Sequence, residues 1–406
     1  MAVALLALAL GAFAIGTNEF VTMGLLPQVA DGLQVPVADA GHLISAYALG
    51  VVLGAPLLTA LSTRLERKRA LLLFLGAFVV GNLATVLAPS YGTVFAARML
   101  AGLPHGAFLG VGSLTAAHLA GPDRQSRAVA RVLLGLTVAN IVGVPAGTFL
   151  GQVFGWRAAF LVVAVIGALA AAGVVAFVPT TPKPAGDGLR HELTALRGRQ
   201  VVLGLATAVF GFGGVFAVYT YISPMLTGLA GMPEGSVPLV LALFGVGMTG
   251  GSLIVGPLGD RALRPTIYGA LASLAVVLLV FAVGVHAAWS AVVLTVVLGA
   301  VGFGVTAPLQ VLVMQKAGGA PTMAAASNHS AFNLANAGGA WIGGVGISSG
   351  LGLASPAVIG SVLAVVGLAI AVAAGMSDRG QGPTPRYVTG KTREHGPEPL
   401  AAADTE

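Results

Sequence analysis

Residues 179–199 read PTTPKPAGDGLRHELTALRGR and form a long polar interruption in a chain of apolar segments. The stretch is proline-rich at its start and charged and amphipathic afterwards, which is typical of a linker. On each side of it lie six apolar runs of roughly 20 residues, each long enough to cross a hydrocarbon core of about 30 Å as a helix. The sequence therefore predicts an all-α membrane protein with twelve transmembrane helices in two six-helix halves.

The ends of the apolar runs are set by charges, proline and glycine. The predicted spans are 2–26, 41–62, 70–88, 91–119, 128–152, 157–178, 200–225, 236–258, 266–286, 288–316, 321–348 and 354–376. This map divides the chain into an N-terminal six-helix bundle (1–178), a cytoplasmic linker (179–199), a C-terminal six-helix bundle (200–376) and a disordered cytoplasmic tail (377–406).

The composition excludes a soluble fold. Of 406 residues, 56% are hydrophobic and 8% charged, whereas a soluble domain carries about 25% charged residues. The 59 glycines suit close packing of helices in lipid, where apolar burial no longer drives association. The chain has no cysteine, which excludes disulfides, thiolate metal sites and cysteine nucleophiles.

Basic residues predict the orientation of the spans. Eighteen of the 20 Lys and Arg residues fall on one side of the predicted map, and the other two are Arg157 at the opposite side and Arg98 inside a span. Because basic residues near span ends stay in the cytoplasm, we expect both termini to be cytoplasmic. The net charge of +6 then reflects topology, and it does not indicate nucleic-acid binding.

Glu19 is the one acidic residue of 14 that falls inside a predicted span. An ionised carboxylate there costs about 2.5–3.5 kcal/mol, so we expect Glu19 to gain and lose a proton as its surroundings alternate between dry and wet. If protonated Glu19 and substrate compete for one cavity, an inward proton gradient drives substrate outward. The alternative is a permanently neutral carboxyl bonded to Asn18, Thr17 or backbone.

Arg98 is the second charge inside a span, and on a helix it shares a face with Gly102 and His105. Glu19 and Arg98 fall at similar depth, so a direct pair is possible. Arg98 either tunes the Glu19 carboxylate or donates structurally to helix carbonyls. His105 is a candidate proton relay, with a packing histidine as the alternative.

Aromatic and amide side chains are the candidates for substrate contacts, because apolar walls with a few polar groups suit weakly polar ligands. The seventh span offers Phe212, Phe216 and Tyr219, and the eleventh offers Asn328, Phe332, Asn333 and Asn336, with Asn18 and Asn140 as further polar candidates. The alternative for the aromatic stripe is packing within the bundle.

Several short motifs carry a family resemblance. The fourth span contains Arg98-x-x-x-Gly102-x-x-x-Gly106, the fifth contains Gly143-Val-Pro145-Ala-Gly147-x-x-x-Gly151, and Gly-Pro-Leu-Gly-Asp-Arg at 256–261 follows the eighth. With Gly-Thr-Asn-Glu-Phe at 16–20, the chain resembles the twelve-span drug:proton antiporters of the major facilitator superfamily, and bacterial chloramphenicol, arabinose and purine efflux transporters in particular.

The resemblance implies roles for these motifs. Asp260, Arg261, Arg264 and Arg64 would form a conformational latch at the cytoplasmic helix ends, and Gly143, Pro145, Gly147 and Gly151 would form the antiporter motif. The chain departs from the family where Thr63 replaces Asp, Glu66 replaces Gly and Val144 replaces Gly. The resemblance also implies the major facilitator fold and alternating access around a site between the halves.

These observations predict a proton-coupled exporter of small hydrophobic or amphiphilic compounds, of the multidrug or chloramphenicol type, in the bacterial inner membrane. It would need no cofactor besides the proton gradient, and would act as a monomer in contact with substrate, protons and lipid. The alternatives are a dedicated sugar or purine nucleoside exporter and a passive uniporter. A membrane enzyme would need paired carboxylates, a histidine cluster or an activated nucleophile, and the embedded residues do not supply one.

Overall fold

The computed structural model describes residues 1–62, 64–121, 124–180, 198–317 and 321–378. Within these residues the chain forms helices joined by short turns, with no β-strand. Eleven helical segments of this described part are long and apolar enough to cross a membrane. The predicted all-α membrane fold is confirmed.

The N-terminal bundle holds the first six spans, several of which are built from two helices. Its elements are α1 (Ala2–Gly24), α2 (Leu26–Leu33), α3 (Val37–Ser62), α4 (Arg67–Leu87), α5 (Tyr91–Gly102), α6 (His105–Ala120), α7 (Gln125–Val138), the π-helix η2 (Ala139–Gly143), α8 (Val144–Phe154) and α9 (Trp156–Phe177). The first span continues through α2 and is therefore longer than the predicted 2–26.

The C-terminal bundle repeats this arrangement. Its elements are α11 (Arg199–Thr220), α12 (Ile222–Gly228), the short 3-10 helix η3 (Glu234–Ser236), α13 (Val237–Arg261), α14 (Leu263–Gly284), α15 (Ala288–Gly304), α16 (Thr306–Lys316), α17 (Pro321–Gly346), the π-helix η4 (Ile347–Leu351) and α18 (Ser355–Asp378).

The eleventh span in chain order is α17, which is less apolar than the other spans and is not among the eleven segments counted above. It is 26 residues long and packs against α11 of its own bundle and α3 of the other. Its buried side chains include Asn328, Asn333 and Asn336. Because α17 lies between two protein helices, these amides avoid the lipid, and the low hydropathy of the span follows from its position.

Proline explains most of the breaks inside spans. The helices are interrupted at Leu25, Leu103, Tyr221 and Val305, each one to three residues before a proline in the sequence. Proline lacks an N–H donor and its ring clashes with the preceding turn, so a helix bends or breaks there. The breaks recur in equivalent spans of the two halves, the first and seventh and the fourth and tenth, which supports an internal repeat.

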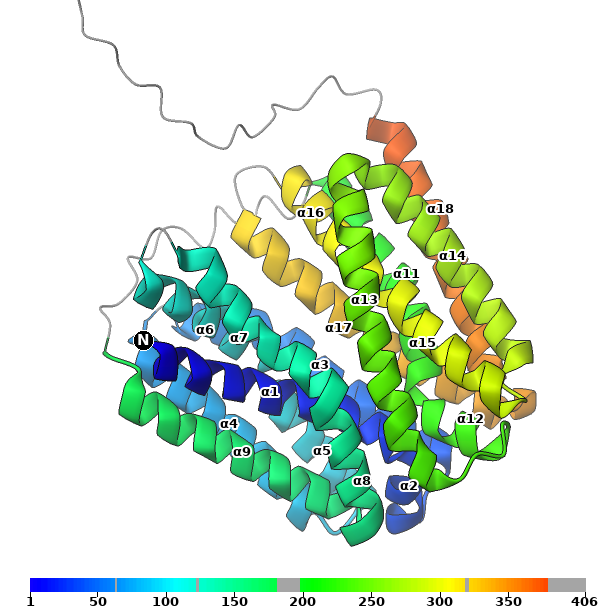
Figure 1. Cartoon of the computed structure of the whole chain (residues 1–406), viewed down its shortest axis with the longest axis horizontal. Helices are drawn as coiled ribbons and strands as arrows, with labels where there is room; N and C mark the ends of the chain where they lie inside the picture. The colour runs from blue at the N-terminus through cyan, green and yellow to red at the C-terminus, as the bar shows by residue number, and fades with distance from the viewer. Residues whose placement is uncertain (63, 122–123, 181–197, 318–320, 379–406) are drawn as a thin grey trace, which may run out of the picture.

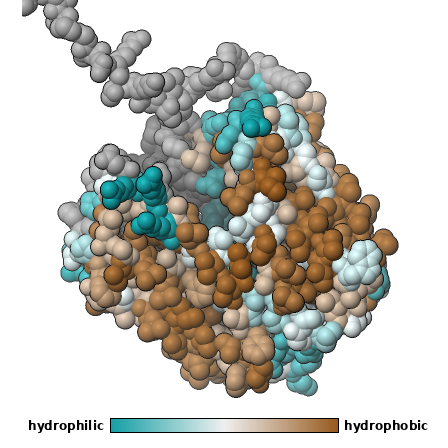
Figure 2. Space-filling model, in the orientation of Figure 1, coloured by the Kyte–Doolittle hydropathy of each residue, from teal (hydrophilic) through white to brown (hydrophobic). Residues whose placement is uncertain are grey.

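The two bundles meet at one end and diverge at the other (Figure 1). We call the end that carries the N-terminus and the last turn of α18 the terminal end, and the other the far end. At the far end, Gln28 Nε2 donates to Glu234 Oε2 at 3.0 Å and Gln152 Nε2 donates to the Glu234 carbonyl at 2.9 Å. Toward the terminal end, Figure 2 shows the molecule hollowed between the bundles.

The apolar core has the same asymmetry. One cluster of buried side chains joins both bundles and includes Phe20, Leu26, Phe216 and Leu226. A second cluster, which includes Leu8, Phe74 and Phe108, is confined to the N-terminal bundle. The contact between the bundles is therefore built mainly from residues near the middle and the far end.

Two predicted segments fall largely outside the described residues. Of the predicted linker at 179–199, the structure describes 179–180 and 198–199, and of the predicted tail at 377–406 it describes 377 and 378, at the end of α18. The linker and tail assignments therefore stay predictions.

Candidate functional site

Glu19 lies on α1 where the two bundles meet. Its side chain is 12% exposed, and its Oε2 atom lies 3.9 Å from Nε2 of His105 in the same bundle. Asn336 of α17, from the other bundle, lies beside the same carboxyl group. The embedded carboxyl is therefore adjacent to side chains of both bundles.

Arg98 is fully buried but does not pair directly with Glu19. Its Nη1 atom donates to Oδ1 of Asn18 at 2.7 Å, and its Nη2 atom donates to the Asn18 carbonyl at 3.2 Å. The guanidinium also lies over the rings of Tyr47 and Phe160, 4.5 and 5.1 Å from their centroids. Such stacking and bidentate donation suit arginine better than lysine. Asn18, predicted to bind substrate, thus holds Arg98.

His105 connects Glu19 to two further side chains. Its Nδ1 atom lies 3.0 Å from the Tyr47 hydroxyl, and its ring lies 5.4 Å from the ring of His329 in α17. Tyr47 therefore touches both His105 and Arg98. The arrangement places four ionisable side chains of the N-terminal bundle and one of the C-terminal bundle in one continuous cluster.

Close backbone packing brings these residues together. A Cβ atom added at Gly102 would lie 2.1 Å from the Tyr47 carbonyl oxygen, so α5 can cross α3 only with glycine at this position. One added at Gly143 would lie 2.1 Å from Oγ1 of Thr17 on α1.

The other glycines of the predicted antiporter motif also face α1. Gly147 lies against Val21 and Gly151 against Leu25, while Pro145 occupies the first turn of α8 after the π-helix. The motif therefore packs along the helix that carries Glu19, and its role in transport stays a prediction.

The predicted aromatic residues form a cluster that also includes Phe20, Phe244 and Phe303, which the sequence did not indicate. Phe212 lies 4.9 Å from both Phe303 and Phe332 between ring centroids, and Phe216 lies parallel to Phe20 of α1 at 6.2 Å. Tyr219 stacks on Phe244 at 3.9 Å. Phe20 belongs to the N-terminal bundle, so the cluster crosses the interface one residue from Glu19.

The predicted amides supply unpartnered polar atoms at the same interface. Neither the oxygen nor the nitrogen of Asn328 has a hydrogen-bond partner among the described residues, whereas Asn336 faces the Glu19 carboxyl. Asn333 donates to the His329 carbonyl at 3.1 Å and Asn140 to the Leu136 carbonyl at 2.9 Å, which leaves their oxygens unpartnered. Buried polar groups left unpaired cost about 1–3 kcal/mol each, so these amides are suited to bind water or a ligand.

The predicted latch residues lie at the terminal end. Arg264 pairs with Asp378 at the end of α18 and donates to the Gly375 carbonyl, and Lys316 of α16 binds the same carboxylate. Asp260, Arg261 and Arg64 are exposed and form no ion pair within the described residues. The ion pairs therefore hold α14, α16 and α18 together, and the latch role stays a prediction.

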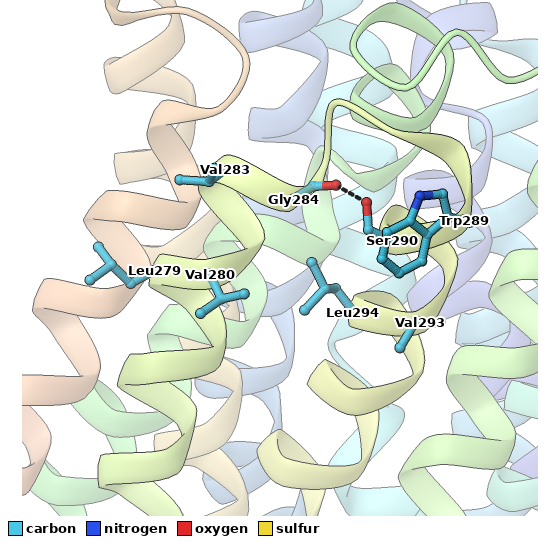
Figure 3. A pocket seen from close by; sticks show the side chains of 8 residues that line it. All are labelled: Leu279, Val280, Val283, Gly284, Trp289, Ser290, Val293 and Leu294. Carbon is cyan, nitrogen blue, oxygen red and sulfur yellow. Dashed lines mark hydrogen bonds between the residues drawn. The ribbon is translucent and has the colours of Figure 1, made fainter.

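A groove of about 650 Å³ lies apart from this cluster, between α14 and α15 (Figure 3). It is lined by Val283, Trp289 and other apolar residues, and Ser290 closes its rim by donating to the Gly284 carbonyl at 2.5 Å. Val283 and Trp289 are more than 70% exposed, so the groove opens on the outer surface of the molecule. No group of three or more His, Asp or Glu that could hold a metal ion occurs among the described residues.

Sequence reasoning missed Tyr47 and His329. The rule that singled out Glu19, an ionisable residue inside an apolar span, also applies to His329 and could have found it. Tyr47 had no such signal, because a tyrosine in a membrane helix is ordinary, and only the crossing of α3 with α5 and α6 gives it partners.

The chain is similar in sequence and structure to known membrane transporters. The sequence model described as Major Facilitator Superfamily matches residues 8–344. The inner membrane transport protein YdhP of Escherichia coli (strain K12) is 43% identical over 90% of this chain and 94% of its own length. A chloramphenicol resistance protein of Streptomyces lividans is 35% identical over 90% and 94%. The crystal structure of a D-xylose-proton symporter, 17% identical, superposes with a TM-score of 0.73 over 90% of this chain and 96% of that one.

Proposed function

This chain belongs to the major facilitator superfamily, and we propose that it exports small hydrophobic or amphiphilic compounds in exchange for protons by alternating access. It is a multi-pass membrane transporter and not an enzyme. The proposal adds the direction of transport, the coupling ion and the class of substrate, and it places the protein as a monomer in a bacterial inner membrane.

One observation carries the coupling hypothesis, namely that Glu19 lies between the bundles and is adjacent to His105 of one and Asn336 of the other. A group in this position changes its surroundings whenever the bundles move relative to each other. Burial favours its protonated form and access to water favours the carboxylate. Movement of the bundles can therefore control when Glu19 binds and releases a proton.

We infer the orientation of the protein in the membrane from its basic residues. Arg64, Arg124, Arg264 and Lys316 all lie near the terminal end, and lysine and arginine concentrate on the cytoplasmic side. We therefore assign the terminal end to the cytoplasm. With the far end joined and the terminal end apart, this conformation is the one that releases protons to, and takes substrate from, the cytoplasm.

The substrate class rests on the aromatic cluster and on the unpartnered amides of α17. Aromatic rings supply apolar contact area, and a small number of amides fix the orientation of a ligand. The relative named for chloramphenicol resistance supports an antibiotic-like substrate. A sugar or nucleoside exporter is the second candidate, and it needs more hydrogen-bonding groups than these amides provide.

The membrane potential supplies enough free energy to drive the proposed export. One net charge that crosses about 150 mV gains about 3.5 kcal/mol. This free energy supports a substrate concentration ratio on the order of a few hundredfold.

The test is substrate-stimulated proton release from purified protein in detergent near neutral pH. The panel contains chloramphenicol, a nucleoside and a pentose. We expect one compound to release protons from the wild type and none from Glu19→Gln. Glu66→Gln is the matched control, because Glu66 directly precedes α4 and pairs with Arg69 in the first turn of that helix, so its loss should leave proton release unchanged.

The outcomes separate the candidate functions. The compound that releases protons identifies the substrate class directly. Binding of a compound without proton release from the wild type would contradict antiport and favour a passive uniporter. Equal release from Glu19→Gln and the wild type would move the proton site to another residue.

A further inference from the structure

We propose that His329 is the residue through which the proton released by Glu19 leaves the site, after it has passed over His105. The inference rests on the proposed proton exchange at Glu19. It adds a residue of the C-terminal bundle to proton handling, so the exit path is complete only when the two bundles are positioned as in this conformation.

The three side chains form a row that leads toward the terminal end. Glu19 Oε2 lies 3.9 Å from His105 Nε2, and the His105 ring lies 5.4 Å from the His329 ring. On α17, which begins at the terminal end, His329 comes seven residues before Asn336, the neighbour of Glu19. Seven residues of helix correspond to about 10 Å. The path therefore runs from the interface toward the end where the bundles separate.

The contact between Tyr47 and His105 allows His105 to accept the proton. When Nδ1–H of His105 donates to the Tyr47 oxygen, 3.0 Å away, Nε2 carries the lone pair and faces Glu19. The O–H bond of the Glu19 carboxyl then breaks as an N–H bond forms at Nε2, leaving a carboxylate and an imidazolium. The Nε2–H bond of the imidazolium then breaks as an N–H bond forms at the unpartnered Nε2 atom of His329. The proton on Nδ1 of His329 passes to water, and both histidines return to the neutral form.

The surroundings of His329 fit a transient acceptor. Its Nε2 atom is buried and has no hydrogen-bond partner among the described residues. A Cβ atom added at Gly106 would lie 3.7 Å from Cδ2 of His329, an ordinary contact distance, so the His329 imidazole lies directly beside α6, next to His105.

The other charged or titratable groups around the row are Arg98 and Tyr47. Arg98 stays bonded to Asn18 and stacked on Tyr47, so it lies beside the path without occupying it. Two imidazolium groups at this distance would repel each other, which favours passage of one proton at a time.

The test uses the proton itself as ligand and needs no substrate. After a pH jump on the purified protein in detergent, time-resolved infrared spectroscopy follows the carboxylic acid band that Glu19→Gln removes. We expect His329→Ala to slow its disappearance by about a hundredfold, the lower end of the range for general acid–base catalysis. Imidazole added to the buffer should restore the rate in proportion to its concentration. His118→Ala, which removes an exposed imidazole from α6, should stay within about twofold of the wild type.

A second variant guards against a folding defect. His329→Gln should be slowed to a similar extent without rescue by imidazole, because the glutamine fills the space. A wild-type rate in His329→Ala would overturn the relay. A slow rate that imidazole leaves unchanged would assign His329 a structural role instead. If the wild type has no carboxylic acid band that depends on Glu19, proton exchange at Glu19 fails as well, and that result is distinct from a failure of His329 alone.

Discussion

The two bundles contribute different chemistry to the interface between them. The N-terminal bundle supplies ionisable and charged groups, Glu19, Arg98 and His105, whereas the C-terminal bundle supplies aromatic rings from α11 and amides from α17. His329 is the exception on the C-terminal side. Under the proposed function, this division would place proton handling and substrate recognition on opposite sides of the interface, and each could then be altered separately.

The proposed division of roles between the two bundles is tested most severely at Glu19. If protons and substrate compete, the apparent Kd of the wild type should fall by up to about tenfold for each pH unit of increase, because the carboxyl must lose its proton before substrate binds. Glu19→Gln should bind with a Kd that is independent of pH. Calorimetric titration at several pH values measures both. A pH-dependent Kd in the variant would show that the proton acts elsewhere.

Arg98→Lys should cause the next largest effect. Lysine keeps the charge but loses the paired donation to Asn18 and the stacking on Tyr47, at a cost of about 2 kcal/mol in the free energy of unfolding. Thermal unfolding of the purified protein measures the change. Arg69→Lys, whose side chain is exposed and pairs with Glu66, is the control, and an equal shift in both variants would contradict the assignment.

Phe212→Leu tests the same division of roles from the side of the C-terminal bundle. It should raise the substrate Kd about fivefold, since aromatic contacts contribute about 1 kcal/mol beyond the area they bury. Its pH dependence should match the wild type. The control is Phe78→Leu, because Phe78 is buried within the N-terminal bundle away from the interface. A loss of pH dependence in Phe212→Leu would mean that the two functions are not separate.

The smallest effect is expected at the far end, where the Tyr221 hydroxyl donates to the Ala340 carbonyl at 2.8 Å and approaches Ala38 of the other bundle at 3.4 Å. Tyr221→Phe should shift the population toward the state that is open at the far end by about threefold, as expected for one weak hydrogen bond. Spin labels on introduced cysteines in α2 and α12 report the distance, with no native cysteine to interfere. Tyr268→Phe, whose bond to Ala371 stays within one bundle, should leave that distance distribution unchanged.

The spans could be predicted from the sequence because lipid requires long apolar helices, and only the length and the flanking charges are needed to find them. The predicted span at 70–88 and the helix Arg67–Leu87 agree within a few residues. The breaks at Leu25 and Tyr221 were not predicted, although Pro27 and Pro224 contained the signal. A proline inside a long apolar run divides the helix there, although the run as a whole is still long enough to span the membrane.

The partners of the site residues could not be predicted, because they depend on how helices cross. That Arg98 is buried followed from its place in a span, but its bonds to Asn18 depend on α5 lying against α1 and α3 at one particular rotation. The same holds for His105 and His329, which are more than 200 positions apart in the chain. Sequence periodicity assigns a residue to a face of its own helix and does not identify the opposing helix.

The proline breaks described above have a mechanical consequence. At these points the helix has already lost a backbone hydrogen bond, so bending there breaks no further one. Each interrupted span consists of two short helices joined at a break where bending costs little. The breaks occur in matching spans of both halves. Under the proposed alternating access, one end of the molecule would open by bending at these breaks while the helix beyond each break keeps its contacts, and the opposite end would open in the same way.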